Sequence, residues 1–132
     1  MLARNTRILV VDDMMTMRKL IIRSCQEIGF LNFVEAADGA IAWEKLSVAN
    51  PPIGLIICDW NMPNVSGLEF LKRLRVDERF KDLPFILLTA ESEKAQVAEA
   101  INSGVTSYIV KPFNTETLRV KLEKVNLSIS DF

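Results

Sequence analysis

Five polar residues stand at the ends of short apolar runs, where their side chains could combine in one reaction: Asp12, Asp13, Asp59, Thr89 and Lys111. The chain contains no histidine, so a set of oxygen donors favours a hard cation such as Mg²⁺, which takes carboxylates together with phosphate oxygens. Beside such a cation, a carboxylate can attack a phosphoryl donor, while lysine and threonine contact the oxygens of the transferring group. These residue types predict an aspartyl phosphate at Asp59.

Each of these residues also has an ordinary explanation. Asp12 or Asp13 could cap the following helix, and Asp59 could begin a turn closed by Pro63. Thr89 could be a loop hydroxyl and Lys111 a solvated charge. Three carboxylates gathered at one place would repel one another, by roughly 4 kcal/mol per pair at 4 Å and an effective dielectric of 20. Raised pKa values, the Lys111 ammonium or a divalent cation could each relieve that repulsion.

Five β-rich runs alternate with helical patterns along the chain, and they predict strands at residues 7–11, 33–37, 54–58, 84–88 and 107–111. Alternating units this short indicate an α/β fold, a doubly wound five-stranded parallel sheet with five helices, and 2-1-3-4-5 is the leading strand order. Ligands bind at the carboxyl ends of the strands in such sheets, near the point where the chain order reverses. That edge is where the five polar residues would meet.

Apolar residues between the strands recur at helical spacing and predict helices that each pack inward on one stripe. The predicted stripes are Met14, Met17, Ile21, Cys25 and Ile28; Ile41 and Leu46; Leu68, Leu71 and Leu74; Val97 and Ile101; and Leu118, Leu122 and Val125. Gly29 and Gly104 fall just past two stripes, where a left-handed C-terminal cap favours glycine.

Length and composition limit the class of protein. The 132 residues, 49% of them hydrophobic, suit one domain, expected to span 1–132 with an ordered core at about 6–127. A net charge of -1 gives no indication of nucleic acid or of a membrane surface as partner. No apolar stretch approaches the length of a membrane span and no secretory signal is visible, so we expect a cytoplasmic chain. Cys25 and Cys58 are expected to be buried free thiols.

Ordered motifs over nearly the whole chain resemble those of response-regulator receiver domains, and most closely the CheY-like single-domain chemotaxis regulators. They are ILVVDD followed by TMR, then DWNMPN, LTAE, and YIVKPF followed by TETL. The resemblance implies a flavodoxin-like fold and a phosphorylation-activated signalling protein of two-component systems. Such a protein is no enzyme beyond its own Mg²⁺-dependent phosphoryl transfer and autodephosphorylation.

The resemblance also implies roles for individual residues. Asp59 accepts phosphate from a phosphohistidine on a sensor histidine kinase. Asp13 and Asp59 bind Mg²⁺ together with the Asn61 carbonyl, while Asp12 acts mainly through water. Lys111 bridges to the phosphoryl group and precedes a cis peptide bond to Pro112. The remaining implied sets are the switch residues Thr89 and Tyr108 and the dephosphorylation-modulating residues Asn61, Glu91 and Met14.

The implied output surface would bind the flagellar motor switch protein through Lys94, Val97, Ile101, Tyr108 and Lys121. The chain would act as a monomer, and a dedicated phosphatase is a further candidate partner. Met14, Glu93 and Ile101 depart from the best-known members, which bears on donor and partner choice. A phosphate sink or a regulator of a non-motor target is therefore the alternative within the family.

Two other classes share part of this pattern. A phosphohydrolase of the haloacid-dehalogenase type needs a general acid two positions after its nucleophile, and Asn61 stands there instead. A flavodoxin-like binding module needs a Ser/Thr/Gly-rich phosphate loop after the first strand, where this chain carries DDMMTM. Both are weaker interpretations of the sequence.

Overall fold

The computed structural model describes residues 2–90 and 94–130 and places five parallel strands in one sheet, in the order β2-β1-β3-β4-β5. The strands are β1 (Arg7–Val11), β2 (Asn32–Ala36), β3 (Leu55–Asp59), β4 (Phe85–Ala90) and β5 (Ser107–Lys111). The helices are α1 (Met15–Ile28), α2 (Gly39–Val48), α3 (Gly67–Arg75), α4 (Lys94–Asn102) and α5 (Thr115–Ser130). The predicted fold class, strand order and five helices are confirmed.

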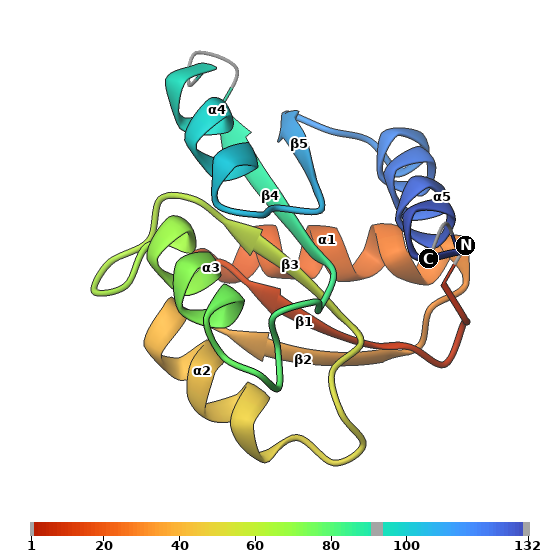
Figure 1. The fold of residues 1–132 in the computed structure, drawn as a ribbon. Helices are drawn as coiled ribbons and strands as arrows, with labels where there is room; N and C mark the ends of the chain where they lie inside the picture. The colour runs from red at the N-terminus through yellow and green to blue at the C-terminus, as the bar shows by residue number, and fades with distance from the viewer. Residues whose placement is uncertain (1, 91–93, 131–132) are drawn as a thin grey trace.

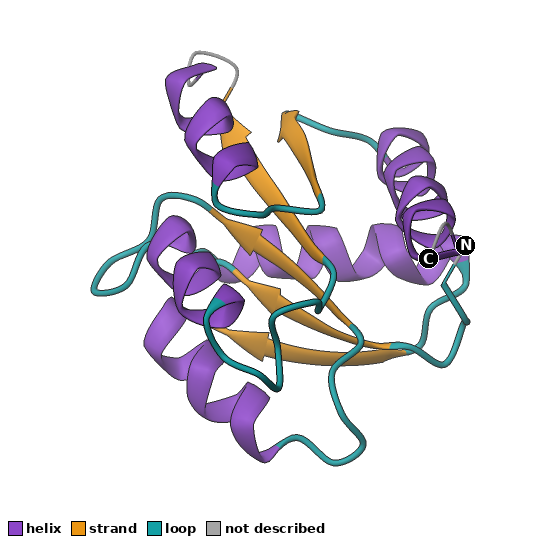
Figure 2. Cartoon of the chain, in the orientation of Figure 1, coloured by secondary structure: helices purple, strands orange, loops and turns teal. Residues whose placement is uncertain are grey.

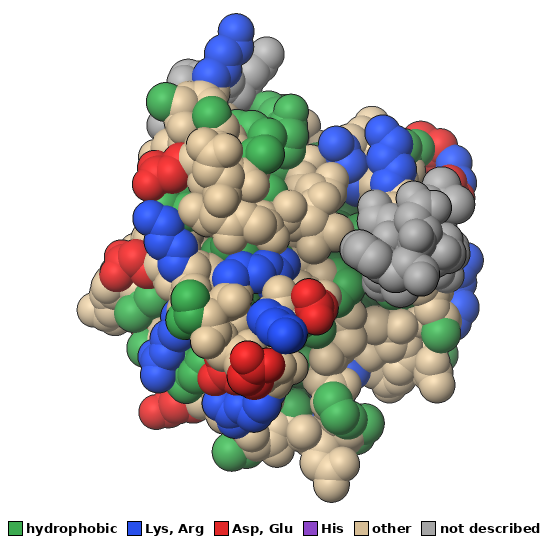
Figure 3. Space-filling model, in the orientation of Figure 1, with side chains coloured by type: hydrophobic (Ala, Val, Ile, Leu, Met, Phe, Trp, Pro, Cys, Tyr) green, Lys and Arg blue, Asp and Glu red, His purple; other side chains and the backbone are tan. Residues whose placement is uncertain are grey.

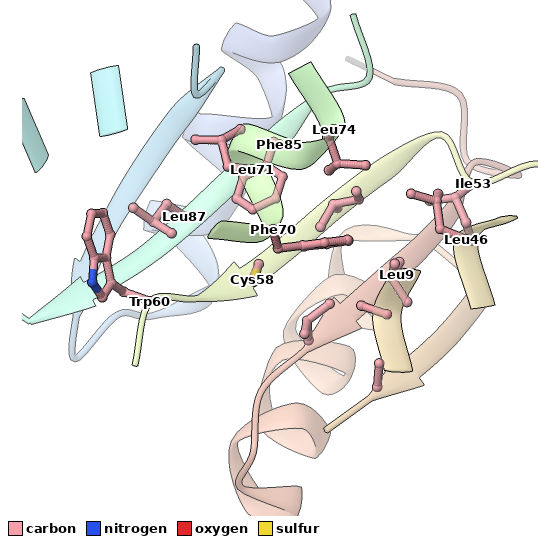
Figure 4. Close-up of a cluster of buried hydrophobic side chains, with 14 of the residues drawn as sticks. Leu9, Leu46, Ile53, Cys58, Trp60, Phe70, Leu71, Leu74, Phe85 and Leu87 are labelled. Carbon is pink, nitrogen blue, oxygen red and sulfur yellow. The ribbon is translucent and has the colours of Figure 1, made fainter. Parts of the chain in front are cut away.

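Helices cover both faces of the sheet, as Figures 1 and 2 show. Successive side chains of a strand point to opposite faces, so each buried strand contributes to two hydrophobic clusters. Leu9, Cys58 and Leu87 pack with α2, α3 and α4 in one cluster, part of which is drawn in Figure 4. Ile8 and Ile57 pack with α1 and α5 in the other. This double coverage explains why the central strands are continuous apolar runs in the sequence.

The predicted bounds of β1 and β5 are confirmed, whereas the ends of β2, β3 and β4 differ by one or two residues from the prediction. β3 extends to Asp59, which pairs with Leu88 of β4, so the carboxylate belongs to the strand itself. β4 begins after Pro84 and continues to Ala90, because Ala90 pairs with Lys111 of β5.

Three residues of the predicted inward stripes are instead exposed. Met14 is 58% exposed because it precedes α1 as its N-cap. Ile41 and Ile101 are also exposed, since α2 turns Ala42 and Leu46 inward and α4 turns Ala100 inward. The other predicted stripe residues are buried or partly buried.

Local signals at the helix ends agree with the structure. Gly29 and Gly104 have φ values of 121° and 93°, in the left-handed region that favours glycine. Ser66 and Glu69 form a complete capping box at the start of α3.

Two other predictions are confirmed. Cys25 and Cys58 are free and buried, and the Lys111–Pro112 peptide bond is cis; the Asn50–Pro51 bond is also cis. None of the described helices has the length and apolar character needed to cross a membrane.

Candidate functional site

The carboxyl edge of the sheet brings three aspartates together. Asp12 follows β1, Asp13 is next to it, and Asp59 ends β3, the neighbour of β1 in the sheet. One carboxylate oxygen from each lies within 4.8 Å of the others. Asp12 and Asp59 are buried, with 1% and 6% exposure, while Asp13 is exposed. The convergence expected from the topology is therefore present, with one side of the cluster open to solvent.

Hydrogen bonds from Met14, the N-cap of α1, and from Arg18 within α1 hold the turn that carries Asp12. Its Oδ1 accepts from the Met14 backbone N–H at 2.9 Å, and its backbone carbonyl accepts from Arg18 Nη1 at 2.7 Å. Arg18 Nε also donates to the Glu35 carboxylate at 2.9 Å. Neither Asp12 nor Asp13 is the N-cap residue of α1, which is Met14. Asp12 is therefore not a helix cap, although its side chain binds the backbone N–H of the N-cap residue Met14.

Lys111 enters the cluster from the end of β5. Its Nζ donates to Asp59 Oδ1 at 2.8 Å and lies 3.8 Å from Asp12 Oδ2. Asp12 Oδ2 is buried and has no hydrogen-bond partner among the described residues. Burial raises the pKa of Asp12, and the nearby Asp59 carboxylate raises it further. One ammonium group therefore leaves negative charge in this cluster uncompensated.

The donor set at this edge fits a hard divalent cation. Three carboxylates converge on one place, and one of them presents a buried oxygen without a hydrogen-bond donor among the described residues. Oxygen ligands without nitrogen or sulfur are typical of Mg²⁺, which keeps several of its waters. Asp13 is exposed, so the cluster is open to water on that side.

Close packing of Gly67 against the Asp59 backbone holds Asp59, the candidate nucleophile, in position. A Cβ atom on Gly67, the first residue of α3, would lie 2.3 Å from the Asp59 carbonyl oxygen. The Gly67 N–H donates to the Trp60 carbonyl at 2.9 Å, and the Trp60 N–H donates to the Leu88 carbonyl at 3.1 Å. Glycine is required at position 67 because α3 begins directly against the backbone of Asp59 and Trp60. Asn61, the next residue along, is exposed.

Thr89 and Tyr108 lie on the side of the edge formed by β4 and β5. Thr89 is 1% exposed, and its hydroxyl donates weakly to the Ala90 carbonyl at 3.4 Å. Tyr108 is half-buried, and Lys121 Nζ lies 5.0 Å from its ring centroid. A pocket of about 250 Å³ is lined by Ala90, Lys94, Val97, Tyr108 and Val110. A hydrophobic group over α4 and β5 is visible in Figure 3.

The other predicted residues that the structure describes lie on α4, on α5 or directly before α1. Lys94 and Ile101 are exposed on α4, Val97 is half-buried there, and Lys121 is half-buried on α5. Met14 is exposed beside Asp13 in the chain. Glu91 and Glu93 lie outside the described residues.

Several residues that hold the site were not predicted from the sequence: Arg18, Glu35, Asp38, Asn64 and Gly67. Asp38 stands before a helical pattern, which is a recognisable N-cap signal. The contacts of Arg18 and Asn64 join segments far apart in the chain, and no local signal predicts them.

Comparisons with known proteins agree with this arrangement. The family described as response regulator receiver domain matches residues 8–123. The chemotaxis protein CheY1 of Helicobacter pylori is 46% identical over 119 residues, 90% of this chain and 95% of that protein. CheY-3 of Vibrio cholerae is 42% identical over 124 residues, 94% of each chain.

A solved structure shows the same fold. The chemotaxis response regulator CheY4 of Vibrio cholerae superposes with a TM-score of 0.82 at 36% identity, covering 92% of this chain and 98% of that one. The fold, the ordered motifs and these matches lead to one conclusion. The chain belongs to the response-regulator receiver domain family and is of the CheY type.

Proposed function

We propose that this chain is a chemotaxis response regulator that is phosphorylated on Asp59 by a sensor histidine kinase and then binds the flagellar motor switch. The observation that carries the proposal is the position of Asp59. It is 6% exposed, its carboxylate accepts a 2.8 Å hydrogen bond from Lys111, and it lies within a group of three aspartates. This is an oriented carboxylate beside one fixed ammonium, open to solvent on the side of Asp13.

In the proposed transfer, an Asp59 carboxylate oxygen forms a bond to phosphorus as the P–N bond of the donor phosphohistidine breaks. The electron pair of that bond returns to the imidazole nitrogen, which takes up a proton from solvent. Lys111 already lies against Asp59 and can pair with a phosphoryl oxygen of the product. Thr89, at the end of the adjacent strand β4, can donate its hydroxyl to another once it leaves the weak contact with Ala90.

Asp12, Asp13 and Asp59 would hold Mg²⁺, together with the Asn61 carbonyl that the family pattern adds. When bound, Mg²⁺ neutralises charge on the oxygens of the transferring group. The buried Asp12 oxygen, which has no donor among the described residues, supports this role for the cluster, because removing it from water without a partner is costly.

Output would follow from a change on the surface formed by α4, β5 and α5. Thr89 immediately precedes Ala90, which lines the pocket beside Tyr108, so a shift of Thr89 toward a phosphoryl group alters one wall of that pocket. Exposed Ile101 and Val110 give the surface an apolar character suited to a protein partner. Phosphorylation would favour one of two arrangements of this surface.

The test is intact mass spectrometry after incubation with acetyl phosphate and Mg²⁺. We expect the wild-type chain to gain one phosphoryl group and the Asp59→Asn variant to gain none, because the amide is not a nucleophile for phosphorus. An equal gain in both proteins would contradict the assignment of Asp59. No gain in the wild type would contradict the phosphorylation proposal as a whole.

A further inference from the structure

Asp38 uses its two carboxylate oxygens in two different directions. It is the N-cap of α2 and is 7% exposed. Its Oδ1 accepts from the Ile41 backbone N–H at 2.9 Å, which is the ordinary capping bond. Its Oδ2 accepts from Asn64 Nδ2 at 3.1 Å, and Asn64 belongs to the segment between β3 and α3. A helix cap needs only the first of these bonds.

The segment held by this second bond is 60–66, which leads from Asp59 to α3 and contains Asn61. In Figure 1 it projects beside the beginning of α2. Asn64 has a φ of 67°, in the left-handed region, and the Val65 N–H donates to the Pro63 carbonyl at 2.8 Å. The segment therefore makes a tight turn whose tip carries the Asn64 amide.

Two further contacts join this turn to α2. The Gly39 N–H donates to the Val65 carbonyl at 3.4 Å, and a Cβ atom on Gly39 would lie 2.6 Å from Val65 Cγ1. Hydrogen bonds from Ile41 and then from Asn64 hold the pKa of Asp38 below its usual range, so the carboxylate is charged at neutral pH. Charge-assisted hydrogen bonds of this kind are stronger than neutral ones.

We propose that Asp38 is a positioning residue for the metal site: through Asn64 it fixes the segment 60–66, and thereby the Asn61 carbonyl that completes the Mg²⁺ ligands. This inference rests on the proposed function, because the Asn61 carbonyl is a ligand only if the cluster binds Mg²⁺. Groups that hold a metal ligand in place without touching the metal limit where that ligand can move. The Asp38–Asn64 bond would act in this way on the Asn61 carbonyl.

Two variants separate this role from helix capping. Asp38→Ser keeps an N-cap oxygen for Ile41 but removes the acceptor for Asn64. Asn64→Gly keeps the left-handed backbone and removes the amide, so it leaves Asp38 and its cap untouched. The control is Asn114→Ala, which removes the side-chain acceptor of the Thr117 N–H at the start of α5.

The measurement is Mg²⁺ affinity of the unphosphorylated chain, from the fluorescence of Trp60, which follows Asp59 directly. We expect Asp38→Ser and Asn64→Gly each to weaken Mg²⁺ binding about tenfold, the lower end for loss of an outer partner of a metal ligand. The double variant should bind no more weakly than either single one, because both changes break the same bond. Asn114→Ala should lower thermal stability and leave Mg²⁺ affinity unchanged.

Unchanged Mg²⁺ affinity in both variants, with wild-type binding intact, would overturn the positioning role and leave Asp38 as a helix cap. Strictly additive losses in the double variant would also overturn it. Absence of Mg²⁺ binding in the wild type would overturn both this inference and the proposed metal site, so the two failures are distinguishable.

Discussion

Helices α3 and α4 are each nine residues long and pack on the same face of the sheet, yet they are held very differently. Among the residues that the structure describes, α3 buries Gly67, Phe70, Leu71 and Leu74, whereas α4 buries Ala100. Figure 4 shows the three large α3 side chains within the cluster. α3 also begins with a complete capping box directly against Asp59, so it belongs to the part that carries the chemistry.

Two polar contacts close to the surface also join α3 to α4 and to the residues that follow it. Lys72 Nζ lies 3.5 Å from Glu99 Oε1, with both side chains more than half exposed. Arg75 Nε donates to the Gly104 carbonyl at 2.8 Å, just beyond the end of α4. Such contacts contribute little compared with burial of aromatic and aliphatic side chains. The difference indicates a firmly packed part that holds the aspartates and a lightly packed helix that can shift at low cost.

The largest expected difference between the two helices is in folding stability. Phe70 is fully buried and its ring lies 6.0 Å from that of Phe85, so Phe70→Ala should lower the free energy of unfolding by about 3–5 kcal/mol. Val97 on α4 is half-buried, and Val97→Ala should cost about 1 kcal/mol or less. Urea unfolding followed by circular dichroism measures both values. Similar costs for the two variants would contradict the comparison.

The fold was predictable because its main signal is burial on both faces. The runs RILVV and GLIIC are almost continuously apolar, which is typical of strands covered by helices on each side. From that alternation the topology follows, and the topology places Asp12, Asp13, Asp59 and Lys111 at one edge. Strand ends were less predictable, since pairing partners such as Leu88 for Asp59 determine where a strand stops.

The sequence was a poorer guide to which helix residues face the core and to the contacts that support the site. Periodicity assigned Met14 to an inward stripe, but Asp12 binds the Met14 N–H and keeps this residue ahead of the helix. Likewise, Ile101 fits a helical repeat although the shorter Ala100 faces the core. The Asp38–Asn64 bond joins residues 26 apart in the chain. It depends on how α2 packs beside α3 and the segment before it, which no local pattern determines.

The second expected difference concerns partner binding by α4. Ile101 is 56% exposed on the proposed output surface, so Ile101→Asp places a charge in an apolar contact without disturbing the core. We expect about tenfold weaker binding of the phosphorylated chain to a flagellar motor switch peptide, or about 1.4 kcal/mol. Fluorescence anisotropy of the labelled peptide measures this affinity, and equal phosphorylation of both proteins is checked by mass.

The matched control for that experiment is Val48→Asp on α2. Val48 is 80% exposed, but it lies outside the proposed output surface. We expect unchanged peptide affinity for this variant. Equal losses from the two substitutions would show that net charge, and not the α4 surface, determines binding. Full affinity in Ile101→Asp would remove α4 from the proposed interface.

The smallest expected effect is a pH dependence in the firmly packed part. Glu35 accepts hydrogen bonds from Lys19 at 2.7 Å and Arg18 at 2.9 Å. These bonds, and chiefly the one from Lys19, hold the pKa of Glu35 below its usual range. Because the pKa is lowered in the folded chain, the charged Glu35 stabilises the fold fully above the pKa of the unfolded chain. This contribution is lost as pH falls through the folded-state pKa.

Glu35→Gln should therefore lower the free energy of unfolding at neutral pH, by less than about 1 kcal/mol because the site is partly exposed to solvent. Urea unfolding at a series of pH values should show this difference between the two proteins shrinking in acid, since the protonated carboxyl group of Glu35 and the amide that replaces it are both neutral. If the difference in unfolding free energy between the two proteins stays constant at acid pH, the Arg18 and Lys19 bonds contribute through packing and not through charge.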